Sequence, residues 1–310
     1  MNEVIFTYKK KRTLNDLVNQ FIDVIVARRI GSRSREFNLV RGGKMAIFAS
    51  DYIGIHINQY GFFDAANLAI VFSFLAPILD EIKNDAALDI GANIGNHSIY
   101  FSNYFCSILS FEPHPKIFDL LTFNSKMVNN VIAYNFGLGD EKKTLELNEN
   151  WENMGSSSIK HHSNGDDRKV NINIRRLDDI ELGSNGISLI KIDVEGFESN
   201  VIRGGLATIN KYQPIIILEQ LESEFIDGST DALELLKKEG YVFCWHQSWA
   251  ASRGWLARRI NTVRNILLGG TYDYNFLTGN MPPKATYGMI IAVPARFQSQ
   301  LLLSPKLVVQ

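Results

Sequence analysis

Residues 87–96 read ALDIGANIGN, where an apolar run ends in an aspartate and a glycine-rich turn follows at once. Such a strand and turn are typical of an open α/β sheet that receives a nucleotide-like ligand. The glycine spacing is Gly91-x-x-x-Gly95, and Asn93 stands where a dinucleotide site has its second glycine. No Gly-Lys-Ser/Thr of a P-loop follows. The turn therefore disfavours both a dinucleotide and a nucleoside triphosphate.

Apolar runs alternate with helical patterns on both sides of this stretch, which predicts an α/β domain with a doubly wound, mainly parallel sheet. The core strands read as continuous apolar runs, as expected when helices cover both faces. The predicted strands are 86–91, 106–112, 131–136, 187–194, 214–219, 240–245 and 287–294. The predicted helices are 94–104, 114–128, 196–210 and 230–239. Residues 144–175 break the rhythm and predict two extra strands joined by a polar loop.

The ends of the chain are predicted to differ from this pattern. Residues 1–84 form an N-terminal helical and short β extension, and residues 85–310 form the main domain. Within the extension we expect a helix over 13–29, with one apolar face, and a short β-like region around 45–60. An apolar helix near 64–83 is buried, because its run of about 15 apolar residues is short for a membrane span. A basic amphipathic helix is predicted over 255–268.

Composition is that of an ordinary globular protein, with a net charge of −1. The charge is uneven, since residues 1–44 carry ten Lys and Arg against four acids. This basic segment can contact a lipid-linked glycan peripherally, although a solvated helix face is the more common reading. Neither nucleic acid nor a transmembrane segment is expected, and the oligomeric state stays open. Two isolated cysteines, Cys106 and Cys244, and the absence of a signal-peptide pattern favour the cytoplasm.

The pattern Asp-x-Gly-x-x-x-Gly suits a ligand with a zwitterionic amino-acid tail, because an acid near the strand end can bind the ammonium. S-adenosylmethionine has such a tail, a sulfonium cation and a ribose. This ligand predicts a second acid about 20 residues on, at the end of the next strand, to hold the ribose hydroxyls. Glu112 stands there, 21 residues after Gly91. The alternative for Glu112 is an acid at a helix start.

Four segments together resemble the FkbM-type methyltransferases. These are LDIGANIGNHSIYFS, SFEPHPKIFDLLTFNSK, RRLDDI and LIKIDVEGFESNVIRGG, the last followed by QPIIILEQ. The resemblance covers about residues 86–220, in the right order and spacing, and leaves the variable part 245–285 unmatched. It implies S-adenosylmethionine-dependent enzymes of the class I Rossmann-like fold.

In such a sheet the ligand lies across the carboxyl ends of the strands. We expect Asp89 and the turn to hold the methionine tail, Glu112 and its neighbour to hold the ribose, and the segment 136–140 to approach the adenine. The predicted cofactor-binding residues are Asp89, Gly91, Ala92, Asn93, Gly95, Asn96, Glu112, Pro113, Gly137, Leu138 and Asp193.

Methyl transfer to a hydroxyl requires alignment and loss of a proton. The candidate catalytic residues are Asp193, Glu195, Glu219 and His246. Asp193 and Glu195 follow the fourth strand and face the sulfonium; alternatively Glu195 caps the next helix, with Glu198 at the surface. His246 follows the sixth strand and is either a base or a packed residue. A divalent cation on Asp193, Glu195 and Glu219 is possible but not favoured.

The favoured function is O-methylation of a hydroxyl on a sugar, a glycan or a secondary metabolite. Four tryptophans in the variable segments favour a carbohydrate, since aromatic rings stack on sugars; these are Trp151, Trp245, Trp249 and Trp255. The alternatives are a methyltransferase of protein or nucleic acid and a non-catalytic binding module of the same fold. The intact Asp89, Gly91, Gly95 and Glu112 disfavour the binding module.

Overall fold

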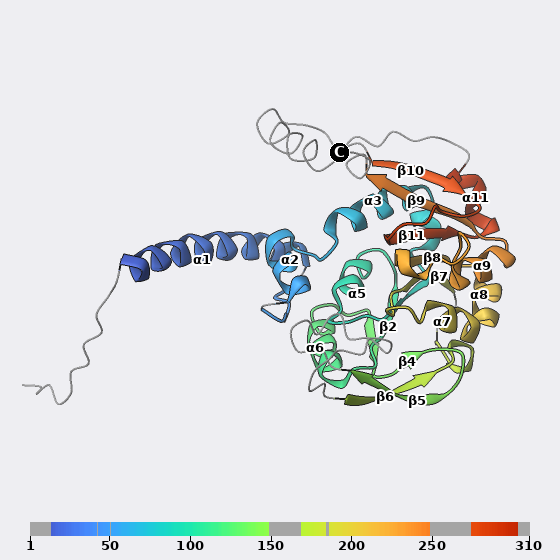
Figure 1. The fold of residues 1–310 in the computed structure, drawn as a ribbon, viewed down its shortest axis with the longest axis horizontal. Coiled ribbons are helices and arrows are strands. Elements are labelled where there is room, and N and C mark those ends of the chain that lie inside the picture. The colour runs from blue at the N-terminus through green and yellow to red at the C-terminus, as the bar shows by residue number, and fades with distance from the viewer. Residues whose placement is uncertain are drawn as a thin grey trace, which may run out of the picture.

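The computed structural model describes residues 14–41, 43–49, 51–148, 169–183, 186–248 and 274–302. Its main sheet has eight strands in the order β10-β9-β11-β8-β7-β1-β2-β3, and a smaller sheet has the order β4-β6-β5 (Figure 1). The strands are β1 (Ala86–Ile90), β2 (Ser107–Phe111), β3 (Val131–Tyr134), β4 (Gly137–Leu138), β5 (Lys143–Asn148), β6 (Lys169–Arg175), β7 (Ile187–Ile192), β8 (Ile215–Gln220), β9 (Val242–Ser248), β10 (Tyr274–Gly279) and β11 (Tyr287–Val293).

The predicted doubly wound sheet is confirmed. The strands β3, β2, β1, β7 and β8 run parallel, and β11, β9 and β10 continue the sheet in antiparallel pairs. Chain order reverses direction between β1 and β7, which is where such folds bind their ligands. The extra pair predicted within 144–175 is also present, as antiparallel β5 and β6.

Helices cover both faces of the main sheet. Neighbouring residues of a buried strand point to opposite sides, so each strand contributes side chains to two cores. On one face Leu88 and Ile190 share a core with residues of α7 and α9. On the other, Ala87 and Leu189 share a core with residues of α3, α5 and α11. The helices are α1 (Leu14–Arg41), α2 (Tyr52–Tyr60), α3 (Ala65–Leu75), α4 (Leu79–Ile82), α5 (Asn96–Phe101), α6 (Pro115–Ser125), α7 (Glu198–Gly204), α8 (Leu206–Tyr212), α9 (Asp231–Lys238) and α11 (Ala295–Leu302), with short 3₁₀ turns at Ala76–Ile78, Leu177–Asp179 and Glu222–Glu224.

The β-like region predicted around 45–60 is wrong, because residues 52–60 form helix α2. Isoleucines at alternate positions in YIGIHINQY resemble a strand, but the local end signals favour a helix. The Asp51 carboxylate accepts a hydrogen bond from Gly54 N at 2.5 Å, and Gly61 ends the helix with φ +90°. The division at residue 84 stays a prediction.

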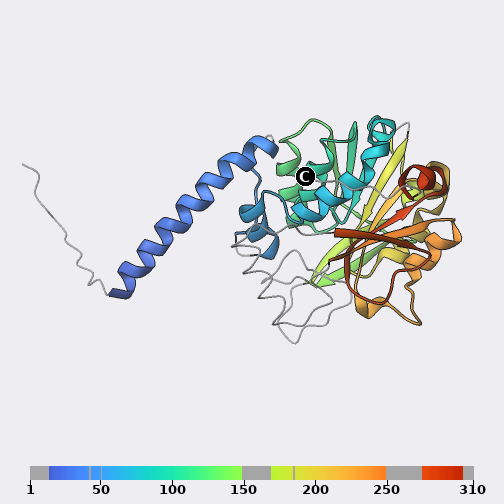
Figure 2. The same ribbon diagram turned by 90° about the horizontal axis from the view of Figure 1, so that it is seen from above.

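Helix α1 projects away from the main domain, as two perpendicular views show (Figures 1 and 2). It extends well beyond the predicted 13–29, to Arg41, so the predicted apolar segment and the arginine-rich segment after it form one continuous helix. The apolar face predicted there is exposed, with Phe21 67% and Ile22 50% accessible. Arg33 and Arg41 anchor the helix by donating to the carbonyls of Gln59 and Gly61. Contact with a lipid-linked glycan stays a prediction, and the helix predicted over 255–268 lies outside the described residues.

The run Ala65–Ile82 is long and apolar enough to cross a membrane, judged by length and composition alone. It is divided into α3, a 3₁₀ turn and α4. One face is buried in the core under the sheet, with Leu68, Leu75 and Ile78 fully inaccessible. The prediction of a buried helix is therefore confirmed for this face.

The core packing predicts a contrast between two isoleucines in parallel strands. Ile190 in β7 is 0% exposed, whereas Ile132 in the edge strand β3 is 49% exposed. Replacing Ile190 by alanine deletes buried methyl groups and leaves a cavity, so the free energy of unfolding should fall by about 2–5 kcal/mol. Ile132→Ala should lower it by less than about 1 kcal/mol. Urea denaturation measures both, and equal losses would contradict the burial described here.

Candidate functional site

A cavity of about 350 Å³ lies at the carboxyl ends of β1, β2, β7 and β8. This volume lies in the usual range for small-molecule sites. Most of the predicted cofactor-binding residues line it, namely Gly91, Ala92, Asn93, Asn96, Glu112, Pro113, Gly137, Leu138 and Asp193. Three of the candidate catalytic residues, Asp193, Glu195 and Glu219, also line it. Asp89 and Gly95 do not line the cavity.

The glycine turn is packed directly against the end of β7. Gly91 has φ +76°, and a Cβ atom built on it would lie 1.8 Å from the carbonyl oxygen of Asp193. Gly95 has φ +88°, and its Cβ would lie 2.8 Å from Leu121 Cδ1. Both positions therefore require glycine, for backbone conformation and for space. The turn brings its backbone to the cavity wall beside the residues that follow β7.

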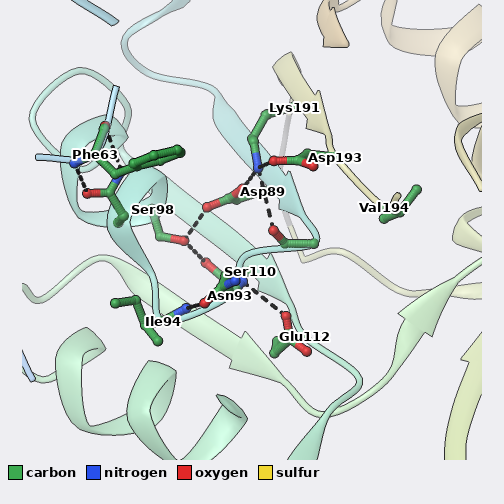
Figure 3. Close-up of polar contacts among 12 residues, drawn as sticks. Phe63, Asp89, Asn93, Ile94, Ser98, Ser110, Glu112, Lys191, Asp193 and Val194 are labelled. Carbon is green, nitrogen blue, oxygen red and sulfur yellow. Dashed lines mark hydrogen bonds and ion pairs between the residues drawn. The ribbon is translucent and has the colours of Figure 1, made fainter. Parts of the chain in front are cut away.

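Lys191 is a buried cation that the sequence analysis missed. Its register partner across β1 and β7 is Asp89, and its Nζ lies 3.6 Å from Asp89 Oδ1 and 3.0 Å from Asp193 Oδ2 (Figure 3). Burial alone would lower the pKa of Lys191, but the charges of Asp193 and Asp89 hold it above its usual range. The ammonium thus stays charged. It joins β1, which precedes the glycine turn, to Asp193, which follows β7.

Asp89 lies beneath the cavity instead of facing it. Its side chain is 0% exposed, and its Oδ2 accepts a hydrogen bond from Ser98 Oγ at 2.6 Å. Ser110 Oγ donates in turn to Ser98 Oγ at 2.8 Å (Figure 3). Asp89 therefore touches the cavity only through Lys191, and its predicted contact with a ligand ammonium stays a prediction.

Glu112 occupies the position predicted for the ribose acid. Its carboxylate accepts a hydrogen bond from Asn93 N at 3.0 Å on one oxygen (Figure 3) and from His114 N at 2.8 Å on the other. Burial raises its pKa to about 7, although both backbone hydrogen bonds oppose this. A ligand hydroxyl that donates to this carboxylate would favour the charged form.

Asp193 and Glu219 form a carboxyl pair at the ends of β7 and β8. Burial and the charge of Asp193 raise the pKa of Glu219 to about 9, so Glu219 is protonated at neutral pH and donates a hydrogen bond to Asp193. Burial opposes the ionised form of Asp193, but Lys191 and this hydrogen bond hold the pKa of Asp193 below its usual range. The pair therefore presents one negative charge, on Asp193, which is 29% exposed.

Backbone strain gathers around the cavity. Among the described residues other than glycine, five have a left-handed φ, and three of these, Asp64, Asn93 and Glu195, line the cavity. Such conformations persist where surrounding contacts hold them, and they cluster at functional sites. Glu195, with φ +52°, is thus held beside the carboxyl pair.

The expectation that Glu198 lies at the surface is wrong. Glu198 is 4% exposed and accepts hydrogen bonds from Val194 N at 3.2 Å and Gly196 N at 3.1 Å. It therefore fixes the loop between β7 and α7, the role that had been considered for Glu195. A carboxylate can bind the free N–H groups ahead of a helix, and burial follows from that contact.

Two further residues from the sequence analysis, Trp245 and His246, lie in strand β9. Trp245 is 7% exposed and packed in the main core, so it offers no face to a sugar in the cavity. Trp151, Trp249 and Trp255 lie outside the described residues. His246 belongs to β9 itself, paired with Phe276, instead of following the strand. Its side chain lies outside the described part, and its catalytic role stays a prediction.

The cation alternative gains no support from the geometry. Within the part of the chain that the structure describes, no group of three or more His, Cys, Asp or Glu is placed to hold a metal ion. The carboxyls predicted for that role, Asp193 and Glu219, are instead joined by a hydrogen bond.

The profile of the methyltransferase FkbM domain matches residues 89–243. Methyltransferase 1 of Beauveria bassiana is 30% identical over 155 residues, which cover 42% of this chain and 61% of that protein. Hexuronic acid methyltransferase AglP of Haloferax volcanii is 28% identical over 146 residues, 45% of this chain and 58% of that protein. The 2-O-methyltransferase NoeI of Sinorhizobium fredii is 28% identical over 170 residues, 48% of this chain and 68% of that protein. The chain thus spans less than two thirds of the first two relatives.

Removing the buried cation should leave two carboxylates unpaired. We expect Lys191→Met to lower the free energy of unfolding by about 3–5 kcal/mol at pH 7. Lys191 holds the pKa of Asp193 below its usual range, so the loss should shrink as the pH falls through the acidic range and Asp193 takes up a proton. Lys237→Met is the control, since Lys237 forms an exposed pair with Glu234 at 3.8 Å and should contribute less than about 1 kcal/mol. Denaturation at several pH values tests this, and a loss that stays constant from pH 7 to pH 3 would contradict it.

The raised pKa of Glu112 predicts a pH dependence of the ligand-free protein. The folded state holds a proton on Glu112 up to about pH 7, whereas the unfolded chain releases it near pH 4.5. Stability should therefore fall as the pH rises through this window, by up to about 3 kcal/mol. The stability of Glu112→Gln should not show this decrease with pH, because glutamine does not titrate. Denaturation curves from pH 4 to 8 measure it, and parallel pH profiles for the two proteins would refute the assignment.

Proposed function

The chain belongs to the FkbM methyltransferase family, and from this premise we propose that it transfers a methyl group from S-adenosylmethionine to a hydroxyl of a sugar or glycan. The observation that carries the proposal is the cavity at the ends of β1 and β7, where Asp193, Glu195 and the glycine turn meet. Glu112 closes the same cavity from the end of β2.

The residues present fit S-adenosylmethionine. Glu112 offers a carboxylate for the ribose hydroxyls, with its position fixed by two backbone N–H groups. Apolar residues, including Leu138 and Ile174, line the adenine side of the cavity together with Phe197. When bound, this cofactor supplies an electrophilic methyl group on a sulfonium cation. The negative charge on Asp193 suits that cation.

Asp193 is proposed to orient the acceptor and take its proton. Its carboxylate accepts a hydrogen bond from the acceptor hydroxyl and directs the oxygen lone pair at the methyl group. The hydroxyl proton becomes strongly acidic as the new C–O bond forms, so a carboxylate with a lowered pKa is still able to accept it. Lys191 and Glu219 keep Asp193 ionised until that moment.

The name of one relative supports a sugar acceptor, and the name of another supports methyl transfer to an oxygen. AglP carries the name hexuronic acid methyltransferase, and NoeI carries the name 2-O-methyltransferase. Methyl transfer to a hydroxyl also fits a cavity lined by the ionised carboxylate of Asp193, which can accept the hydroxyl proton. Action in the cytoplasm stays a prediction.

The proposal predicts different effects for two carboxylates. Glu112→Ala should weaken binding of S-adenosylmethionine at least tenfold, about 1.4 kcal/mol, because the ribose loses its acceptor. Asp193→Asn should lower kcat by about 100-fold or more and change the Kd of S-adenosylhomocysteine, which carries no sulfonium charge, only slightly. Calorimetric titration with S-adenosylmethionine and S-adenosylhomocysteine measures binding, with NAD as a control and EDTA in a parallel run. Transfer of a labelled methyl group to glycans then measures kcat.

Two results would contradict this assignment. An equal loss of cofactor binding and turnover in Asp193→Asn would remove its catalytic role. Absence of cofactor binding by the folded wild-type protein would favour the alternative of a non-catalytic module.

A further inference from the structure

Residues that precede the FkbM domain complete the cavity. Tyr52 and Ile53 from α2, and Phe63 and Asp64 from the loop before α3, line the same space as Asp193. The family profile begins at residue 89 and contains none of them. One part of the cavity wall is therefore supplied by this chain's own N-terminal elements.

Two hydrogen bonds join this wall to the residue that follows the glycine turn. The Asn96 side chain accepts a hydrogen bond from Phe63 N at 2.9 Å and donates one to Phe63 O at 3.0 Å (Figure 3). Asn96 was predicted as a cofactor-binding residue, but both polar atoms of its side-chain amide form these hydrogen bonds with Phe63. The ring of Phe63 contacts that of Tyr52, with centroids 5.8 Å apart, and His56 contacts both. Two aromatic rings, of Tyr52 and Phe63, thus stand at the cavity.

Carboxyl groups outnumber cationic groups around the cavity, although one of them, Glu219, is protonated at neutral pH. Among the described side chains that line it, five are acids and one is a lysine. The acids are Asp64, Glu112, Asp193, Glu195 and Glu219. Lys191 is already paired with Asp89 and Asp193. Burial and the charge of Asp193 raise the pKa of Asp64, so a further negative charge beside Asp64 would be unfavourable.

His97 adds an independent sign of a ligand. It lines the cavity from α5, is 7% exposed, and its buried Nε2 has no hydrogen-bond partner among the described residues. Burial lowers its pKa to about 4, helped by Lys191, so the ring is neutral at pH 7. A buried polar nitrogen without a partner is rare in folded proteins, and a ligand hydroxyl would satisfy it.

We propose that the acceptor is a neutral or amine-bearing sugar ring, held on Tyr52 and Phe63 with Asp64 and His97 as hydrogen-bond partners, and that uronic acids are rejected. This inference rests on the proposed function and names its substrate class. A sugar carboxylate in the cavity would lie beside Asp64 and Asp193, and the one lysine among the described lining residues is already paired with Asp89 and Asp193. Like charges at short range repel. An uncharged or protonated amino sugar meets no such repulsion.

The test uses the full chain loaded with S-adenosylhomocysteine. The probes are methyl glycosides of glucose, galactose and mannose, each compared with its own uronic acid and its 2-amino form. Binding is followed at pH 7.5 by ligand-observed NMR and calorimetry, and methyl transfer is followed separately with labelled S-adenosylmethionine. At least one neutral or amino glycoside should bind tenfold or more tightly than its uronic acid.

Asp64→Asn should reduce this discrimination at least threefold and leave S-adenosylhomocysteine binding unchanged. Asparagine tolerates the left-handed backbone at this position, so the variant should fold. The control is Asp80→Asn, whose side chain is 98% exposed and whose discrimination should equal that of wild type.

Each other outcome overturns a distinct claim. Equal or tighter binding of a uronic acid, or binding of none of the glycosides by cofactor-competent protein, would overturn the substrate class while leaving the methyltransferase proposal in place. Failure to bind S-adenosylhomocysteine would contradict the proposed function itself.

Discussion

A buried ammonium group between two carboxylates is the constraint on which the site depends. Lys191 lies in a strand whose residues are all buried, and it contacts Asp89 on the neighbouring strand and Asp193 beyond its own strand end. An unpaired charge at this depth would be strongly unfavourable, so strand register, turn and loop must bring all three groups together. The same contact keeps Asp193 ionised at the cavity. Stability of the fold and readiness of the site therefore rest on one set of charges.

The parallel sheet was predictable because strands buried on both faces leave continuous apolar runs. β1 and β7 are of this kind, and their predicted positions are confirmed within one or two residues. Helix α2 was missed because its isoleucines at alternate positions mimic a strand, while its Asp51 cap was not recognised. The length of α1 was missed because an exposed helix shows no apolar periodicity over its arginine-rich half.

The cavity was predictable in part, where a residue's role follows from its place at a strand end. Glu112, Asp193 and Glu219 stand where expected, since parallel strands bring their carboxyl ends to one edge. The contact of Asn96 with Phe63 joins segments 33 residues apart, and no local pattern reveals such a pairing. Lys191 did leave a signal, a charged residue inside an apolar run and two positions before an acid. That signal shows its meaning only once the register with Asp89 is known.

The projecting helix α1 sets a length scale for the molecule. Its 28 residues, at a rise of about 1.5 Å each, span about 42 Å. Its two arginine anchors, Arg33 and Arg41, both lie in the half nearest the domain, so the first half is a lever arm without an anchor among the described contacts. The exposed Phe21 therefore stands about 18 Å from Arg33 and about 30 Å from Arg41 along the helix, so a small rotation at the anchors would displace this end of the helix by a larger distance.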